Sequence, residues 1–558
     1  MRDHIAILAV LTAFALSALV VPTLTPIATT DDWTYARSAQ ILLAEGRLTV
    51  FPVVVATAIV PIVWGALFGV VFGPELGVFR LSTVVMTLLG GLALYGICRD
   101  FGVSRARSAL GVATFLFNPL VFVLAFTFMT DPHFVSLLII AVWCFTRGLS
   151  PTAFDARFVV AGSAMAALAF LTRHQGALIV PAVVAFLIAS RRLHFDRASL
   201  RLMVQLVTLP LLAIGGYFAW LISGENVGAM QGSFLREIEQ GGWEGTWWLM
   251  RWLTLFTLLY LGFFILPLIG AVLPFDHHLA PGISPRGRLF AALWALAVIF
   301  GVGGLAQRGD LMPYLPQFVG PMGLGPPDLL GGRPLLLGRE GQTVLTLVCL
   351  LATLVLGFIA ARATAAPISV ERSRAALLGS IGLGQLFGIF PPSYHFLGWS
   401  AGSVDRYLAP LAPIAIVLVL WALRGMPMAL PAGWMLVALL ALVSIAGTRD
   451  YLVFMNEVWS MADQALDAGV PLDRLDAGAG WDGYHLYETG MANQVAPRTE
   501  GGPWWIYMNA PATDSTYVVA GAPLAGYDIL AERPYSSWLS RDEPRLFLLR
   551  RQGEGGPP

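Results

Sequence analysis

The sequence predicts an all-α protein that crosses a membrane many times and ends in a smaller α/β domain. Hydrophobic residues make up 57% of the 558 residues and charged residues only 12%, whereas soluble domains contain about 45 to 50% and about 25%. Apolar runs near the length of about 18 to 20 residues that a transmembrane helix needs recur along most of the chain. After Thr448 the composition changes abruptly. These observations together predict a polytopic membrane domain over residues 1–448 and a second domain over residues 449–558.

Thirteen apolar segments are expected to cross the membrane. The first, from about Ile5 to Val21, has no convincing small-x-small cleavage site after it, so we interpret it as a retained anchor rather than a signal peptide. The other segments begin near Val78, Leu110, His133, Phe158, Ala177, Met203, Arg251, Leu289, Thr343, Ala376, Tyr407 and Pro431.

The run from Phe51 to Phe72 is apolar enough to count as a further span, but loop charge argues against a crossing. If this run does not cross, most loop arginines lie on the side of the N-terminus and most loop acids on the other side. Cytoplasmic loops carry the excess of Lys and Arg, so this arrangement is favoured. We therefore expect the run to lie along the outer interface, broken into short pieces at Pro52, Pro61 and Pro74.

The residues after Thr448 are expected to form an extracytoplasmic domain. An initial helix is predicted from about Asp450 to Ala468. The later aromatic and β-branched runs, such as 504–507, 517–519 and 545–549, alternate with Gly and Pro and predict a small α/β or mostly β fold.

Composition and motifs exclude several classes of protein. The 34 basic residues are balanced by 34 acidic ones, which argues against binding of nucleic acid. Cys98, Cys144 and Cys349 lie in apolar runs and are too few for a disulfide scaffold. His277 and His278 lack partners at metal-ligand spacing and are interpreted as loop residues. The aromatic stretch 243–252 is most simply an interfacial belt.

Three acidic residues at predicted outer helix mouths are candidates for chemistry. Asp31 and Asp32 directly follow the first span, where one carboxylate would cap the next helix and the other would point elsewhere. Asp131 lies in a short outer turn before Pro132 and His133. An acid at membrane depth costs about 2.5 to 3.5 kcal/mol unless it is solvated or paired, so Asp131 is expected to face water, a cavity or a cation. Helix caps, a simple Asp-Pro turn and an interfacial histidine would account for the same residues without any function.

Two arginines lie at the same predicted face. Arg173 stands in Leu171-Thr172-Arg173-His174-Gln175-Gly176, and Arg406 in Asp405-Arg406-Tyr407-Leu408-Ala409-Pro410. The planar guanidinium fork is suited to holding phosphate, although a single interfacial arginine more often extends to lipid headgroups. Two arginines and three acids on one face favour a functional site.

This set of motifs resembles the GT-C membrane glycosyltransferases, especially bacterial relatives of protein O-mannosyltransferases and of the aminoarabinose transferase that modifies lipid A. The resemblance covers about residues 1–448 and is strongest over the first 180. It implies interfacial helices in the first outer loop and inverting transfer of a sugar from a polyprenyl-phosphate carrier at the outer face of the bacterial cytoplasmic membrane. The acceptor is then an envelope lipid, glycan or protein.

The resemblance also implies roles for individual residues. Asp31 matches the first acid of the family motif and is the candidate general base, with Asp32 and Asp131 as further catalytic candidates. Arg173 and Arg406 are candidates for holding the leaving phosphate. Thr34 stands where relatives have an arginine, so that contact would move to Arg37 or be absent. Tyr35, His174 and Tyr407 complete the predicted substrate-binding set. The family implies no metal and no cofactor beyond the lipid-linked sugar donor.

Other classes remain open on the sequence alone. A transporter or lipid flippase would also have many spans, although its ionisable groups usually lie near the bilayer midplane. An O-antigen ligase or polymerase uses the same kind of donor, and the long loop from Gln307 to Gln342 would suit its chemistry. In a receptor that senses through its external domain, Asp31 would be dispensable. Trp481-Asp482-Gly483-Tyr484-His485 is expected to form a turn between packed elements rather than a contact to an acceptor.

Overall fold

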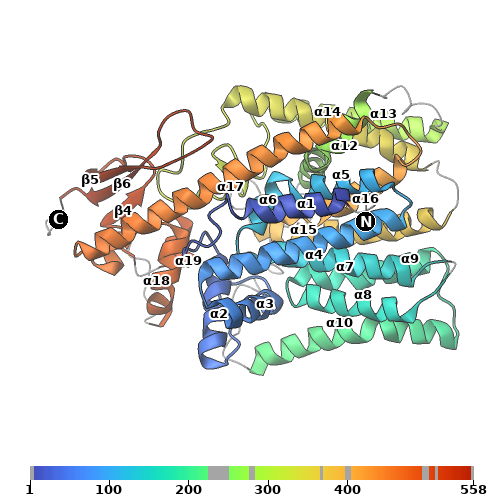
Figure 1. Ribbon diagram of the computed structural model, residues 1–558, viewed down its shortest axis with the longest axis horizontal. Coiled ribbons are helices and arrows are strands. Elements are labelled where there is room, and N and C mark those ends of the chain that lie inside the picture. Colours follow the sequence, from blue (N-terminus) through green and yellow to red (C-terminus); the bar gives the residue numbers. More distant parts are fainter. Residues whose placement is uncertain are drawn as a thin grey trace.

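A bundle of roughly aligned helices, with a small sheet at one end, makes up the fold (Figure 1). This computed structural model describes residues 5–553 except 152, 224–249, 275–282, 365–368, 396–403, 493–501, 509 and 511–512. The predicted loop histidines His277 and His278 and most of the predicted aromatic belt at 243–252 lie outside the described residues.

Among the described residues, five helices are long and apolar enough to cross a membrane, and up to seven spans result if two bent helix pairs each count as one. The chain is therefore a mostly helical multi-pass membrane protein. The bent pairs are α5 (Arg105–Leu116) with α6 (Pro119–Ala125), and the helix Met250–Phe264 with α12 (Leu266–Val272). The five long helices are α4 (Leu76–Asp100), α10 (Arg197–Ser223), α13 (Pro285–Gln307), α14 (Arg339–Thr364) and α17 (Leu430–Asp467).

The remaining predicted spans correspond to helices outside that set, so the number thirteen stays a prediction. These helices are α1 (Ile5–Ser17), α7 (Thr130–Gly148), α8 (Ala156–Phe170), α9 (Ile179–Ala189), α15 (Val370–His395) and α16 (Leu411–Ala422).

Helix α7 lies in the centre of the bundle, where α4 and α8 pack against it. Its approach to α4 is close because Gly90 has no side chain: a Cβ atom there would lie 2.6 Å from the hydroxyl oxygen of Ser136. Small residues allow such approaches between membrane helices. Asp131 in the first turn of α7 and Arg147 in its last turn complement the helix dipole.

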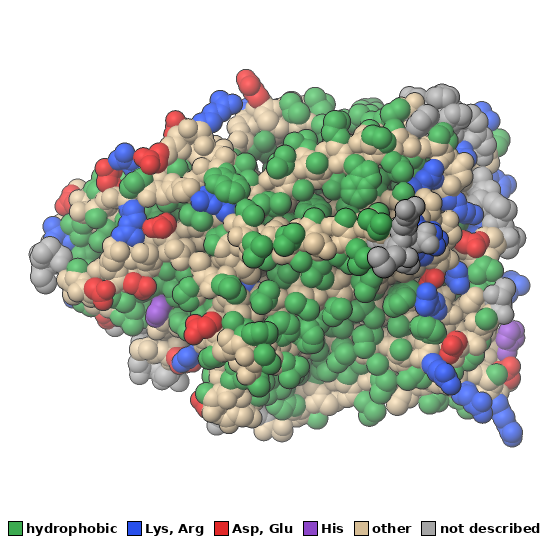
Figure 2. Space-filling model, viewed as in Figure 1, with side chains coloured by type: hydrophobic (Ala, Val, Ile, Leu, Met, Phe, Trp, Pro, Cys, Tyr) green, Lys and Arg blue, Asp and Glu red, His purple; other side chains and the backbone are tan. Residues whose placement is uncertain are grey.

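Arginines at the end of the bundle opposite the sheet bind the carbonyl groups that helix termini leave without partners. Arg107 donates to the carbonyl oxygens of Leu423 at 3.0 Å and Met426 at 2.6 Å, and Arg374 donates to that of Asp100 at 2.6 Å. Figure 2 shows Arg side chains gathered along this end, beyond the broad hydrophobic surface of the helices. Helix α1 begins toward this end of the bundle (Figure 1).

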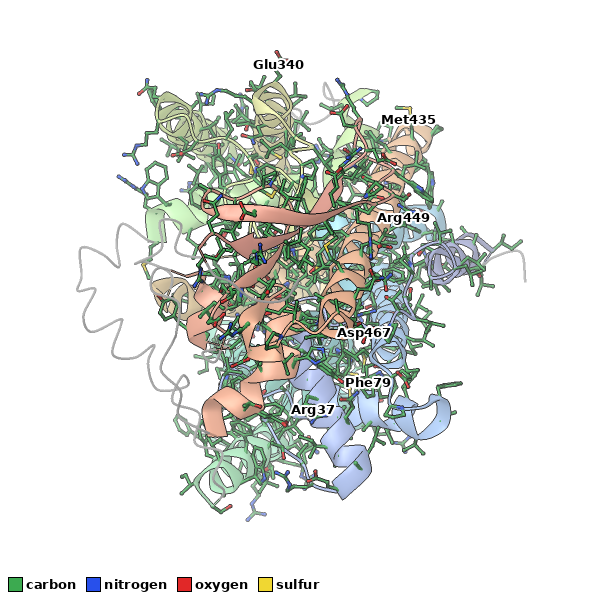
Figure 3. The ribbon with its side chains drawn as sticks, turned by 90° about the vertical axis from the view of Figure 1, so that its left-hand side faces the viewer. Arg37, Phe79, Glu340, Met435, Arg449 and Asp467 are labelled. Carbon is green, nitrogen blue, oxygen red and sulfur yellow. The ribbon has the colours of Figure 1, made fainter. Side chains whose placement is uncertain are left out.

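The first loop forms two helices that run across the direction of the long ones, α2 (Asp32–Glu45) and α3 (Ile59–Phe72) (Figures 1 and 3). The predicted break at Pro61 is wrong, because Pro61 lies in the first turn of α3, where a missing N–H breaks no helical hydrogen bond. The 14 residues of α3 span about 21 Å, which is less than the roughly 30 Å of a bilayer core.

The C-terminal part combines a helix pair with a four-stranded sheet. The strand order is β3 (Leu475–Asp476), β4 (Tyr517–Ala520), β6 (Arg545–Arg551), β5 (Tyr527–Pro534), and only β3 pairs in parallel. The other elements are α18 (Ala479–Ala492) and α19 (Trp504–Met508). Tyr484 and His485 lie on α18, so the turn predicted there is wrong.

The boundary predicted at Thr448 falls inside a helix. The expected last span and the expected first helix of the outer domain form one continuous helix, α17. Asp450 then fastens the sheet domain to this helix, because its carboxylate accepts hydrogen bonds from Ser537 Oγ at 2.6 Å and from the amide of Trp538 at 2.8 Å. The division into two domains stays a prediction, with α17 running through both.

Candidate active site

Six of the nine residues predicted for the site lie close together between the helix bundle and the C-terminal part. They come from four segments that are far apart in the sequence: the N-cap and first turn of α2, the start of α7, the N-cap of the short 3₁₀ helix His174–Leu178 and the short 3₁₀ helix Asp405–Leu408. The six residues are Asp31, Tyr35, Asp131, Arg173, Arg406 and Tyr407.

Asp31 and Arg406 form the centre of the site. Arg406 Nη2 donates to Asp31 Oδ2 at 3.2 Å. The Asp31 side chain is 35% exposed and that of Arg406 is 10% exposed. Asp31 stands at the N-cap of α2, but its side chain makes no capping hydrogen bond, so the predicted cap is not formed by this residue. Its carboxylate is available to solvent and to a ligand.

Arg406 has unused donors although it is buried. Its Nε and Nη1 atoms have no hydrogen-bond partner. A buried donor without a partner costs about 1 to 3 kcal/mol, and more when the group is charged. An anionic oxygen would satisfy either nitrogen, and each of the two forms a planar fork with Nη2, the atom that also donates to Asp31.

Asp32 makes different contacts from those of Asp31. The side chain is buried, Oδ1 accepts from the amides of Thr29 at 2.7 Å and Thr30 at 3.2 Å, and Oδ2 accepts from Thr29 Oγ1 at 2.7 Å. The amide of Phe128 adds a longer bond of 3.4 Å to Oδ2. Because both oxygens are engaged, this carboxylate stabilises the turn before α2, and Asp31 is the acid of the pair that faces outward.

A second ion pair lies next to the first. Arg173 Nη1 donates to Asp131 Oδ1 at 2.6 Å and to Thr130 Oγ1 at 3.1 Å. The Arg173 guanidinium carbon lies 5.2 Å from the centre of the Tyr407 ring, and that of Arg406 lies 5.6 Å from the same ring. Tyr407 thus contacts both cations, which an aromatic face attracts. The paired state that was expected for Asp131 is present.

Tyr35 is buried one helical turn after Asp31. Burial raises the pKa of its phenol above the ordinary value, and the negative charge of Asp31 raises it further. The Tyr35 side chain is therefore a neutral phenol at physiological pH.

Arg37 and His174 are not brought into this cluster. Arg37 lies on the outer part of α2 (Figure 3), where its Nε donates to Glu488 of α18 at 3.3 Å and its side chain is 40% exposed. His174 packs edge-on against Phe170 and Tyr217, with ring centres 6.1 and 6.0 Å apart. Their predicted part in substrate binding has no support in these contacts.

Three supports of the site were missed by sequence reasoning. Asp405, buried beside Arg406, accepts from the amides of Phe318 and Val319 at 3.0 and 2.6 Å and fastens the arginine to the loop after α13. Burial raises the pKa of Asp405 to about 7. Arg80 in α4, fully buried, donates to the carbonyl groups of Thr25 and Ile27 ahead of Asp31.

The third missed residue, Asp328, comes from the predicted long loop. Its Oδ2 accepts from Thr30 Oγ1 at 2.8 Å, and it lies within electrostatic reach of Asp31 and Arg406. Burial raises the pKa of Asp328 to about 6, and the Asp31 charge adds to the rise. The only sign of this residue in the sequence was that it is an acid in a loop of unusual length.

The enclosed space next to Asp131 is too small for a sugar. A cavity of about 10 Å³ is lined by Asp131, Ser136, Thr87 and apolar side chains, and this volume corresponds to about one water molecule. Within the described residues, no three His, Cys, Asp or Glu side chains lie together as a metal site would require. Of the central pair, Asp31 is the residue whose side chain faces solvent, at 35% exposure against 10% for Arg406.

Comparison with known proteins gives a family match over part of the chain. Residues 52–217 match the profile of the family described as dolichyl-phosphate-mannose-protein mannosyltransferase. The resemblance to membrane glycosyltransferases drawn from the motifs is thereby confirmed over a segment that contains Asp131 and Arg173 but begins after Asp31. No protein of curated function matches the sequence significantly.

Solved structures similar to this chain include ArnT from Cupriavidus metallidurans bound to undecaprenyl phosphate, with 16% identity, a TM-score of 0.45 and coverage of 98% of this chain and 99% of that one. The apo state of the same protein gives 14% identity, a TM-score of 0.42 and coverage of 99% of each chain. The oligosaccharyltransferase of Archaeoglobus fulgidus gives 13% identity and a TM-score of 0.40 over 83% of this chain and 58% of that one.

Proposed function

We propose that the protein is a glycosyltransferase that moves a sugar from a polyprenyl-phosphate-linked donor to an envelope lipid, glycan or protein, with inversion, at the outer face of the bacterial cytoplasmic membrane. The observation that carries this proposal is the buried Arg406, which has two unpartnered nitrogens and stands 3.2 Å from the partly exposed carboxylate of Asp31. The family match over residues 52–217 supports the class of reaction.

The proposed reaction needs a base beside the acceptor hydroxyl and a phosphate-binding group beside the leaving phosphate. The acceptor hydroxyl oxygen forms the new bond to that carbon, and Asp31 takes the hydroxyl proton. The bond from the anomeric carbon to the phosphate oxygen breaks, and the leaving polyprenyl phosphate keeps the electron pair. Arg406 donates to the phosphate oxygens as their charge grows, with Arg173 behind it.

Paired acids give the two arginines a fixed geometry before the donor arrives. Asp131 holds Arg173 and Asp31 holds Arg406, so neither guanidinium has to be ordered during the reaction. Tyr35 and Tyr407 are the proposed additional contacts to the sugar or the phosphate. Asp32 is proposed to act through the turn that it stabilises.

The proposal includes the membrane topology that the sequence predicts. Thirteen crossings with a cytoplasmic N-terminus place the site and the C-terminal part outside the cytoplasm. The ion pairs lie at helix mouths, whereas a transporter or lipid flippase usually carries its ionisable groups near the bilayer midplane.

The test compares envelope glycans and glycolipids by mass spectrometry in a deletion strain that carries wild-type protein, Asp31→Asn or Arg37→Gln at equal expression. Loss of one sugar unit, restored by wild type and by Arg37→Gln but not by Asp31→Asn, is the expected result. An unchanged glycan profile in the deletion strain would contradict the proposed activity, and full restoration by Asp31→Asn would remove Asp31 from the reaction.

A further inference from the structure

The N-terminal half of α18 contacts the chain segment that carries Asp31. A Cβ atom on Gly480 would lie 3.1 Å from the carbonyl oxygen of Ala28, and one on Gly483 would lie 2.4 Å from the indole nitrogen of Trp33. Trp33 is 1% exposed, so it has no room to move away from an added methyl group. These two glycines allow a helix of the C-terminal part to approach the turn at residues 28–33 directly.

Asp328 connects the same two parts of the chain through hydrogen bonds. Its carboxylate accepts from Thr30 Oγ1 at 2.8 Å, and its backbone carbonyl accepts from the amide of Ala479, the first residue of α18, at 3.1 Å. Trp504 of α19 lies within hydrogen-bonding reach of the carboxylate. Gly478 has a left-handed backbone with φ of 86° and leaves room for the Asp328 carbonyl, which a Cβ would approach to 2.4 Å.

Further contacts extend along α2. The rings of Trp33 and Tyr487 have centres 5.1 Å apart, and Arg37 pairs with Glu488. Helices α2 and α18 lie against each other at the sheet end of the molecule (Figure 1). Helix α2 runs across the bundle, and α3 and α18 both pack against it.

We propose that Asp328 and Gly483 are positioning residues, which hold the turn before α2 so that the Asp31 carboxylate stands opposite Arg406; this inference rests on the proposed function of Asp31. The C-terminal part is then a component of the catalytic centre. The effect on rate is large for a small displacement, because moving a reacting group by about 1 Å costs about 100-fold.

The test uses four variants of the full chain in detergent or nanodiscs. Asp328→Ala removes the acceptor of the Thr30 hydroxyl, whereas Asp328→Asn keeps an oxygen that accepts it. Gly483→Ala pushes against Trp33. Gly379→Ala is the matched control, because a Cβ on this glycine of α15 meets nothing within 4 Å.

Two readouts are measured: kcat and donor KM with a polyprenyl-phosphate sugar, and hydrogen exchange of the amides in residues 28–33. In Asp328→Ala and Gly483→Ala, kcat falls about 100-fold and the amides of Thr29 and Thr30 exchange faster, while donor KM stays near the wild-type value because Arg406 is untouched. Asp328→Asn and Gly379→Ala keep kcat and exchange near wild type.

Wild-type exchange and kcat in Asp328→Ala and Gly483→Ala would overturn the inference. An equal loss of kcat in Asp328→Asn and Asp328→Ala would also overturn it, since the charge would then matter rather than the hydrogen bond. If the wild-type protein transfers no sugar, the proposed function fails, and the exchange rates alone decide whether these residues position the turn.

Discussion

Replacing Arg406 with Gln is expected to weaken the binding of polyprenyl phosphate by at least about 100-fold. Arg406 offers two buried nitrogens without partners, and a hydrogen bond to a charged group contributes about 1.5 to 3 kcal/mol. Two such bonds correspond to about 3 to 6 kcal/mol, and each 1.4 kcal/mol is about a tenfold change in affinity. The lower bound is used because the Gln amide keeps one donor near the same place.

The matched control is Arg37→Gln. Arg37 is an arginine of the same region, but its side chain is 40% exposed and pairs with Glu488. An exposed ion pair contributes about 0 to 1 kcal/mol, so the loss of this one leaves phosphate binding unchanged. The comparison also tests Arg37 as the phosphate contact that the missing arginine at Thr34 suggested.

The assay is ligand-induced stabilisation of the purified protein. At a ligand concentration of about 100 times the wild-type Kd, the wild type and Arg37→Gln gain about 2.7 kcal/mol. A variant that binds about 100-fold more weakly gains only about 0.4 kcal/mol at that concentration. Full stabilisation of Arg406→Gln would refute the assignment of Arg406, and loss in Arg37→Gln alone would transfer the role to Arg37.

Three further outcomes are expected. Asp31→Asn lowers kcat to near background, because the amide cannot take the hydroxyl proton. The Kd for polyprenyl phosphate, measured by the same stabilisation assay, changes little. A retained kcat would contradict this prediction. Asp131→Ala lowers the free energy of unfolding, measured in denaturant, by about 3 to 5 kcal/mol, because Arg173 is left buried without its counter-charge. An exposed ion pair contributes only about 0 to 1 kcal/mol, so a decrease below about 1 kcal/mol would count against a buried pair. Burial raises the pKa of Asp405 to about 7 from its ordinary value of 3.8, so its stabilising contribution is complete below about pH 4 and is lost as pH rises through 7. The difference in melting temperature between pH 5 and pH 8 is therefore smaller in Asp405→Asn than in wild type, and an equal difference in both would contradict the raised pKa.

The motifs predicted that the charged residues lie on one face, but not which of them pair or how each one is used. Arg173 and Arg406 were identified because an arginine at an outer helix mouth is visible in the sequence. The roles of Asp31 and Asp32 were not separable there, since two adjacent carboxylates differ only in the direction that the backbone gives them. The turn before α2 directs Asp32 inward to the amides of Thr29 and Thr30 and leaves Asp31 outside.

Contacts across long sequence separations were the part that could not be predicted. Asp328 is 298 residues from Thr30, and no local pattern marks an acid in a loop as the partner of a distant hydroxyl. The continuity of α17 was missed for another reason. The charged residues Arg449 and Asp450 look like the end of an apolar span, but Arg449 donates to Ser536 and Asp450 accepts from Ser537, so the helix continues with both charges paired to the sheet domain.

The charge balance of the site explains why an arginine, rather than any cation, is needed at position 406. Asp31 and Asp131 already neutralise Arg406 and Arg173, and Asp328 adds a further negative charge nearby, so the cluster carries no excess positive charge that would attract a phosphate. Binding must then come from the directed N–H groups of Arg406 rather than from net charge. A lysine would keep the charge but concentrate its donors at one point, without the planar fork that two phosphate oxygens require. The unpartnered Nε and Nη1 atoms are therefore the feature of this site on which the proposed phosphate recognition rests.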